Sequence, residues 1–129
     1  MPMDITFPGG VAVEAHVDGF TVRSDQPKEN GGEGSAPSPF DLYLASMGTC
    51  AGFFALRFCH QRDLETKGMK LSMDMERDPE TRLPSKVAMR ITLPDGFPEK
   101  YKRAIIRATD QCAVKRSILD PPEFEVTTD

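Results

Sequence analysis

Hydrophobic and polar residues alternate along the first 24 positions in the manner of short strands. Apolar residues occupy every second position across residues 3–7 and again across residues 11–17. Asp18-Gly19 is a strong two-residue hairpin signal, and the alternation resumes over residues 20–22. The pattern predicts a meander of two or three antiparallel strands.

The composition changes over residues 25–39, where glycine, proline and polar residues predominate. This composition predicts a long loop without regular structure, and it is compatible with a flexible connector or with a functional loop. A phosphate-binding glycine loop is disfavoured, because the lysine and hydroxyl expected after its last glycine are missing.

A long helix is predicted from Pro39 to about Arg62. Ser38 suits the N-cap, Pro39 the first helical position, and Asp41 the N3 position, where it would complete a capping box with Ser38. The sequence after Leu42 is nearly continuously apolar, so the helix must be covered on nearly every side. One small domain can hardly wrap such a helix alone. We therefore expect a second subunit to pack against it.

Period-two alternation returns over residues 69–75 and 87–93, which predicts an antiparallel hairpin around a polar turn at 78–80. Several methionines share one face of this hairpin. A soft-metal site and a gap-filling core both use methionine, and the core is the favoured interpretation.

A second helix is predicted to begin near Pro98, with Tyr101, Ile105, Ala108 and Cys112 on one face and lysines and arginines around the rest. We expect this basic face to be solvated rather than to bind anions. A last short strand is predicted over residues 123–127. The order of elements indicates an α+β fold.

Composition narrows the possible functions. The chain has 129 residues, enough for one domain spanning 1–129. Its 16 Lys and Arg and 20 Asp and Glu give a net charge of −4, which argues against nucleic acid or an anionic membrane as the main partner. No stretch is expected to form a membrane span, and the start lacks a signal-peptide pattern, so a cytoplasmic protein is predicted.

The residue types most often used in catalysis are scarce. His16 and His60 belong to no metal-spaced cluster, and no Cys-x-x-Cys occurs, so a zinc site is not expected. Neither a dinucleotide fingerprint nor a Gly-x-Ser-x-Gly elbow is present. The three cysteines are an odd number, which argues against a disulfide framework and leaves at least one thiol free or paired with another molecule.

The thiols are therefore the candidate chemistry. Small residues on both sides of Cys50 leave room for another group to approach its sulfur. Cys59 lies half a turn around the same helix and is expected in the core. Lys115 and Arg116 follow Cys112 closely, and nearby cations lower a thiol pKa. From spacing alone, a reactive pair of Cys50 and Cys112 and three inert core cysteines both remain open.

Two segments resemble the motifs of the OsmC/Ohr superfamily. Residues 38–50, SPFDLYLASMGTC, resemble the entry to that superfamily's central helix and its reactive cysteine. Residues 108–118, ATDQCAVKRSI, resemble its second motif, a helix-end cysteine followed by a small residue, valine and a basic residue. With the matching order of elements, the resemblance covers nearly the whole chain. The loop over residues 25–32 looks most like the OsmC-like branch often labelled YhfA-like.

The resemblance implies an OsmC-like fold, in which an antiparallel sheet accompanies a long buried central helix and a second helix in an intertwined homodimer. It also implies a possible enzyme, a hydroperoxide reductase acting on organic hydroperoxides and less well on hydrogen peroxide. Cys50 matches the attacking cysteine, which becomes a sulfenic acid, and Cys112 the resolving one. A dithiol such as a lipoylated protein would reduce the resulting disulfide. This chemistry implies no metal or organic cofactor.

The sequence departs from the superfamily at the groups that hold thiolate and peroxide. The glutamate expected ten residues before the attacking cysteine is Phe40 here. Asp41 is the neighbouring acid, although capping the helix is its obvious role, and Arg23 is the candidate for the expected arginine. A slow peroxidase and a different thiol reaction both fit these changes. The alternative to an enzyme is a non-enzymatic dimer that binds a small molecule or senses redox state.

Overall fold

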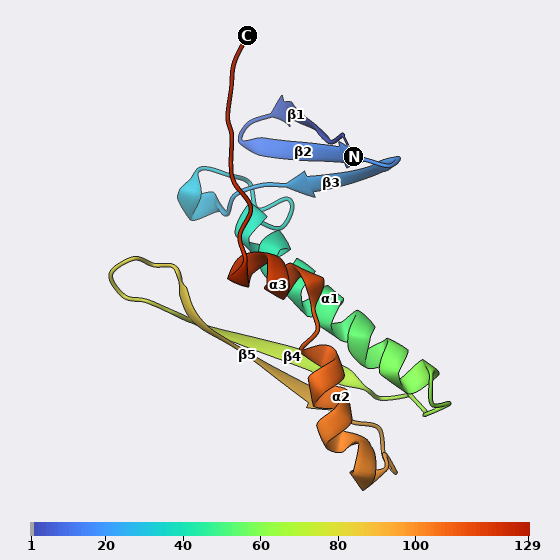
Figure 1. Ribbon diagram of the computed structural model, residues 1–129. Helices are drawn as coiled ribbons and strands as arrows, with labels where there is room; N and C mark the ends of the chain where they lie inside the picture. The colour runs from blue at the N-terminus through green and yellow to red at the C-terminus, as the bar shows by residue number, and fades with distance from the viewer. Residues whose placement is uncertain (1) are drawn as a thin grey trace. The chain divides into compact units, whose positions relative to one another are not determined.

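The computed structural model describes residues 2–129 and is a mixed α+β structure, as the sequence predicted (Figure 1). Its order is β1 (Asp4–Gly9), β2 (Ala12–Val17), β3 (Phe20–Ser24), α1 (Pro39–His60), β4 (Lys70–Arg77), β5 (Pro84–Thr92), α2 (Lys102–Thr109) and α3 (Ala113–Leu119). The chain forms two compact units whose boundary lies within α1, between Ala45 and Ser46. The antiparallel strands form two separate sheets, one in each unit.

The N-terminal unit carries the predicted meander, in the order β1-β2-β3. Asp18 and Gly19 both adopt positive φ in the hairpin turn that aligns Val17 with Phe20. This is the backbone twist that a two-residue turn needs between antiparallel strands. The alternation of polar and apolar residues therefore places polar side chains together on one face of the sheet.

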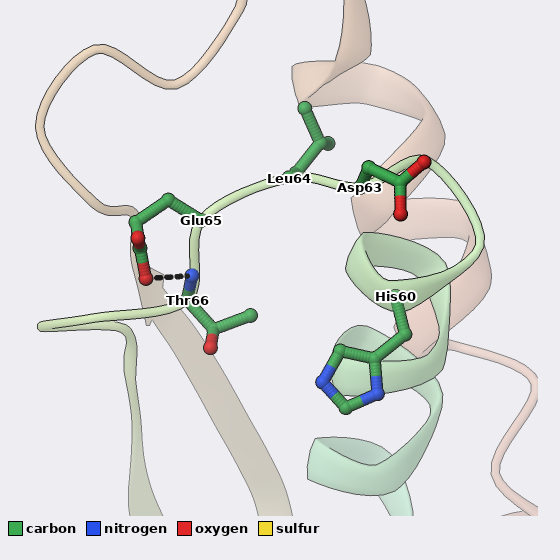
Figure 2. Close-up of a pocket in the computed structure, with 5 residues that line it drawn as sticks. All are labelled: His60, Asp63, Leu64, Glu65 and Thr66. Atoms are coloured by element: carbon green, nitrogen blue, oxygen red, sulfur yellow. Dashed lines mark hydrogen bonds between the residues drawn. The ribbon is translucent and has the colours of Figure 1, made fainter.

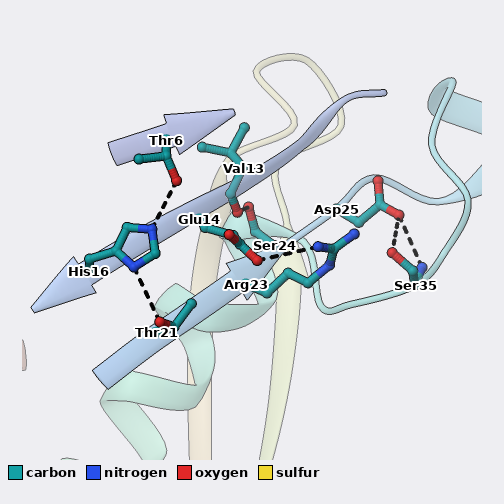
Figure 3. Close-up of polar contacts among 9 residues, drawn as sticks. All are labelled: Thr6, Val13, Glu14, His16, Thr21, Arg23, Ser24, Asp25 and Ser35. Carbon is teal, nitrogen blue, oxygen red and sulfur yellow. Dashed lines mark hydrogen bonds and ion pairs between the residues drawn. The ribbon is translucent and has the colours of Figure 1, made fainter. Parts of the chain in front are cut away.

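Figure 3 shows that polar face. His16 lies between two threonines, with its ring nitrogens 2.8 Å from the Thr6 hydroxyl and 3.2 Å from the Thr21 hydroxyl. Arg23 on β3 forms a 3.3 Å ion pair with Glu14, its direct partner across the strands. Such pairs stabilise the register of neighbouring strands.

The loop after β3 is organised around one carboxylate (Figure 3). Asp25 is only 3% exposed and accepts hydrogen bonds from the backbone N–H groups of Gln26, Glu33 and Ser35 and from the Ser35 hydroxyl at 2.6 Å. These donors, led by the Ser35 hydroxyl, lower the pKa of Asp25 to about 2. Gly32 is required nearby, because a Cβ there would lie 1.9 Å from the carbonyl oxygen of Gln26. The loop thus has a defined internal scaffold that includes a 3₁₀ turn at Lys28–Asn30.

The long helix α1 begins as predicted. The Ser38 Oγ accepts the Asp41 N–H at 3.1 Å, and the Asp41 carboxylate accepts the Ser38 N–H at 3.3 Å, which is a reciprocal capping box. The helix ends at His60, slightly before the predicted end.

The helix α1 is long and apolar enough to cross a membrane by length and composition, contrary to the expectation that no stretch approaches the apolar length of a membrane span. One such helix is weak evidence for a membrane, since the core helix of a soluble protein passes the same test.

The C-terminal unit packs the hairpin of β4 and β5 and the helices α2 and α3 with the second part of α1 (Figure 1). Side chains on β4 alternate between half-buried and exposed, as the period of two predicted. The buried centre of this unit is a cluster of four residues from α1 and α2: Ala55, Phe58, Cys59 and Ile105. The Arg62 guanidinium stacks 3.7 Å from the Phe58 ring centroid and covers this cluster from outside.

Two predictions for the C-terminal region were wrong. The predicted second helix is interrupted: α2 ends at Thr109, and Cys112 lies outside it as the N-cap of a separate helix, α3. The predicted last strand is absent from the described chain, since residues 121–129 have no regular structure. Phe124 and Val126 alternate as in a strand but are 86% and 95% exposed. Alternation alone does not supply the neighbouring strand that a β-strand needs for its hydrogen bonds.

Replacing Asp25 with asparagine should destabilise the protein, because an amide cannot satisfy four donors as a carboxylate does. At about pH 6 we expect a melting temperature lower by roughly 5 °C. The folded pKa of about 2 lies below the ordinary value of 3.8, so this stabilisation is present above about pH 4 and is lost as the pH falls toward 2. The difference between parent and variant should therefore shrink over that window.

Glu33→Gln is the matched control, since it removes one carboxylate from the same loop while keeping the backbone donor at Glu33. Thermal unfolding followed by circular dichroism measures all three proteins. An Asp25→Asn variant as stable as the Glu33→Gln variant at about pH 6 would contradict the assigned role.

Candidate thiol site

The helix α1 carries Cys50 two residues after a close approach to β4. That approach is at Gly48, where a Cβ would lie only 2.9 Å from the Met73 sulfur. Cys50 is partly exposed, whereas Ala51 beside it is buried. The small residues around Cys50 thus allow close packing on one side and leave the thiol accessible.

Cys112 caps the N-terminus of α3. Its sulfur accepts the backbone N–H of Lys115 at 3.3 Å, the bond that a serine or aspartate usually makes at an N-cap. The same sulfur lies 3.8 Å from the carbonyl oxygen of Met47 on α1. Because Cys112 is only 1% exposed, the start of α3 holds it against the turn of α1 that precedes Cys50.

The structure brings Cys50 and Cys112 together and shifts the pKa values of their thiols in opposite directions. The Val114 N–H donates to the Cys50 sulfur and is the main reason that the pKa of this thiol is lowered; the Cys112 thiol, the Ala113 N–H and the Arg116 charge add to the effect. Burial raises the pKa of Cys112, and the neighbouring Cys50 raises it further. Cys50 is thus the member of the pair that ionises first.

The sequence-based expectation that cations lower the pKa of Cys112 was wrong. Burial of the Cys112 sulfur outweighs the donor at its N-cap position, so its pKa is raised. The Lys115 ammonium is paired with Asp110. The cation that follows it, Arg116, lowers the pKa of Cys50 instead.

Cys59 is a core residue, as predicted. It is fully buried in the cluster with Phe58 and Ile105, and its sulfur lies 4.0 Å from that of Met69. Burial raises the pKa of its thiol. The half-turn between Cys50 and Cys59 therefore separates a partly exposed thiol from an inert one.

The other predicted site residues belong to the N-terminal unit. Arg23 is paired with Glu14, and Asp41 is engaged in the capping box with Ser38. Phe40, at the position of the expected glutamate, packs against the Tyr43 ring with centroids 5.3 Å apart. The catalytic roles of Arg23 and Asp41 stay predictions.

Sequence reasoning did not identify Val114 or Ala113, whose backbone N–H groups face Cys50. No side chain encodes this arrangement. The only signal for it was the position of a cysteine just before a short helical segment, where its sulfur acts as a cap.

A shallow pocket of about 500 Å³ lies at the end of α1, lined by His60, Asp63, Leu64, Glu65 and Thr66 (Figure 2). The Glu65 carboxylate accepts the N–H groups of Thr66 and Lys67 at 3.0 and 2.9 Å, so it serves the turn. Among residues 2–129, no group of three or more His, Cys, Asp or Glu side chains is arranged to bind a metal. Neither Cys50 nor Cys112 lines this pocket. Because a thiol can act as a nucleophile, we take the two cysteines, rather than the pocket, as the candidate site.

Residues 32–127 match the family described as OsmC-like protein. No curated protein sequence matches the chain. Among solved structures, one similar chain is named as an osmotic stress induced and detoxification response protein of Psychrobacter arcticus. It is 22% identical with a TM-score of 0.76, over 89% of this chain and 85% of that one.

Two further structures share the fold. One is an organic hydroperoxide resistance protein OsmC of Legionella pneumophila, 20% identical with a TM-score of 0.57, over 92% of this chain and 89% of that one. The other is named as an organic hydroperoxide resistance protein of Vibrio cholerae with captopril bound in one of its active sites. It is 17% identical with a TM-score of 0.57, over 92% of this chain and 84% of that one.

The three thiols should react with iodoacetamide in a fixed order at neutral pH. We expect Cys50 to be alkylated first, since it is partly exposed and its pKa is lowered, and Cys59 at least about tenfold more slowly. Peptide mass mapping of the reduced protein over time measures each site. In guanidinium chloride the three rates should converge, which is the control. Equal rates for Cys50 and Cys59 in the folded protein would contradict the assignment.

Proposed function

The chain belongs to the OsmC-like protein family, and from that premise we propose that it is a thiol-dependent peroxidase that reduces organic hydroperoxides and, less well, hydrogen peroxide. The observation that carries the proposal is the contact between Cys50, whose thiol pKa is lowered, and Cys112, whose thiol pKa is raised. The names of the Legionella and Vibrio proteins, which mention organic hydroperoxide resistance, support a redox role of this kind. Assignment to the YhfA-like branch stays a prediction.

In the proposed reaction, the Cys50 thiolate attacks the outer oxygen of the hydroperoxide. The O–O bond breaks, an S–O bond forms, and the alkoxide leaves and takes up a proton to give the alcohol. The Cys112 sulfur then attacks Cys50, forming the disulfide as hydroxide leaves and is protonated to water. Two electrons pass from the two thiols to the peroxide.

The surroundings of the two thiols fit an attacking role for Cys50 and a resolving role for Cys112. A lowered pKa makes Cys50 the thiolate at lower pH, and a thiolate is the nucleophile. Cys112 is protected by burial and a raised pKa, so it stays reduced until Cys50 has been oxidised beside it. A dithiol, for example on a lipoylated protein, would restore both thiols by exchange.

The proposal includes an intertwined homodimer. Two large apolar residues of α1 support it: Phe53 is 55% exposed and Leu56 is 37% exposed in the single chain. Exposed apolar side chains on a long, strongly apolar helix are typical of a surface that a second subunit covers.

A non-enzymatic role is the second candidate, as a dimeric protein that binds a small molecule or senses redox state. Phe40 favours it, since an aromatic ring packed on Tyr43 cannot supply the carboxylate expected at that position. The name of the Vibrio protein mentions captopril bound in one of its active sites, which supports a small-molecule-binding role.

Consumption of cumene hydroperoxide by the reduced protein, with a dithiol present, tests the proposal. We expect Cys50→Ser to fall to the rate of buffer alone, because serine cannot replace the thiolate. Without the dithiol, Cys112→Ser should complete one stoichiometric turnover and accumulate a sulfenic acid that dimedone traps, because a dithiol would reduce that sulfenic acid directly. Cys59→Ser is the matched control and should consume peroxide like the parent.

A Cys50→Ser variant as fast as the parent would refute the peroxidase. A folded parent protein that consumes no peroxide would also refute it and would favour the binding or sensing role.

A further inference from the structure

The exposed face of α2 combines positive charge with an apolar side chain. Ile105 and Thr109 face the core and are 1% and 7% exposed, whereas Ile106 is 62% exposed. Arg103 and Arg107 are exposed as well, one helical turn before Ile106 and directly after it. A single exposed apolar residue is ordinary on a protein surface, but this one lies between two arginines. It favours a docking surface over the merely solvated face expected from the sequence.

The two arginines are not neutralised by neighbouring carboxylates. The other charged residues of this face have partners, since Lys102 pairs with Glu99 at 2.8 Å and Asp110 pairs with a lysine of α3. Neither Arg103 nor Arg107 forms an ion pair within residues 2–129. Like charges four positions apart disfavour a helix, so this pair does not serve the stability of α2.

These groups fit an acidic protein segment that carries an apolar side chain. A guanidinium can hold a carboxylate through two parallel hydrogen bonds, and arginine is enriched among the residues that contribute most to protein interfaces. A nucleic acid fits less well, because it is bound through many cations and this chain carries a net charge of −4. Charge complementarity therefore favours a protein partner.

The exposed face of α2 lies next to the thiol pair in the chain. The helix ends at Thr109, and Cys112 follows after two linking residues, before α3 begins (Figure 1). Three residues of chain span at most about 11 Å. The Asp110 N–H also donates to the Ile106 carbonyl at 3.1 Å, so the link begins as an ordered continuation of α2. A partner held on this face is therefore brought close to Cys112.

We propose that the exposed face of α2 is the docking surface for an acidic protein segment that carries the dithiol which reduces the Cys50–Cys112 disulfide. This inference rests on the proposed function and names the chemistry of the partner. In the exchange, the two thiols of the partner become a disulfide, and two electrons and two protons pass to the Cys50 and Cys112 sulfurs. Docking accelerates the exchange by raising the local concentration of the dithiol, and it does nothing for a small free dithiol.

The test is the rate at which oxidised protein is reduced by a peptide-bound dithiol, followed by mass spectrometry after acid quenching. One peptide carries dihydrolipoyl-lysine among glutamates with one leucine, and its matched control has glutamine in place of each glutamate. At about 20 mM salt, we expect the acidic peptide to reduce the parent about three- to tenfold faster than the glutamine peptide. The difference should disappear near about 1 M salt. Free dihydrolipoamide should reduce the parent and all variants equally fast.

The double variant Arg103→Gln/Arg107→Gln should lose the advantage of the acidic peptide, and Ile106→Gln should reduce it. Lys70→Gln/Lys86→Gln, which removes two exposed lysines from the β4–β5 hairpin, is the matched control and should follow the parent. Because the two arginines repel each other, the melting temperature of their double variant should be unchanged or slightly higher, which checks that it folds. An advantage that survives in this variant would overturn the proposal, and so would equal rates for the two peptides at low salt.

A binding measurement separates this inference from the proposed function. Fluorescence anisotropy of an acidic peptide without thiols reports docking on the reduced protein. Binding that Arg103→Gln/Arg107→Gln weakens would leave the docking surface standing even if the protein consumed no peroxide. A peroxidase that binds the acidic and glutamine peptides alike would keep the proposed function and overturn the docking surface. A single-stranded oligonucleotide that binds this face more tightly than the acidic peptide would overturn it as well.

Discussion

The contact between the start of α3 and the middle of α1 is the constraint on which the candidate site depends. A single sulfur, that of Cys112, caps α3 through the Lys115 N–H and lies against the Met47 carbonyl of α1. Since a helix cap fixes where a helix begins, the same atom that serves as the second thiol also positions the backbone donors of Val114 and Ala113. The Cys112 sulfur therefore both caps α3 and fixes the backbone donors that lower the pKa of Cys50.

This coupling explains why two nearby thiols differ. Burial alone would raise the pKa of both, because it disfavours the charged form. Cys50 also receives two backbone N–H groups, the Cys112 thiol and the Arg116 charge, and these outweigh burial. Cys112 receives mainly one donor in a buried setting, and burial prevails. The two thiol pKa values are shifted in opposite directions because the two sulfurs lie on different sides of the contact between α1 and α3.

Local chemistry predicted much of the fold. The Asp18-Gly19 turn, the capping box of Ser38 and Asp41 and the period-two hairpin all depend on neighbouring residues, and the structure has each of them. The division of α2 from α3 was missed because no glycine or proline marks it; it depends on a cysteine acting as a cap. The predicted strand near Phe124 failed because strand formation needs a partner that alternation does not reveal.

The site was predictable only in part. The pairing of Cys50 with Cys112 came from the family resemblance, since spacing along the chain does not show that two helices meet. The effect of the cations after Cys112 was assigned to the wrong sulfur, because burial cannot be read from neighbouring residues. The organising role of Asp25 in its loop was likewise invisible, since its donors are as many as ten residues away.

The central claim is that Cys50 and Cys112 of one chain are reaction partners. Disulfide mapping of protein oxidised with one equivalent of cumene hydroperoxide, by non-reducing digestion and mass spectrometry, tests it most directly. The account predicts a Cys50–Cys112 disulfide within one chain, with Cys59 still a free thiol. A disulfide that includes Cys59, or Cys50 oxidised to sulfinic acid while Cys112 stays reduced, would contradict it.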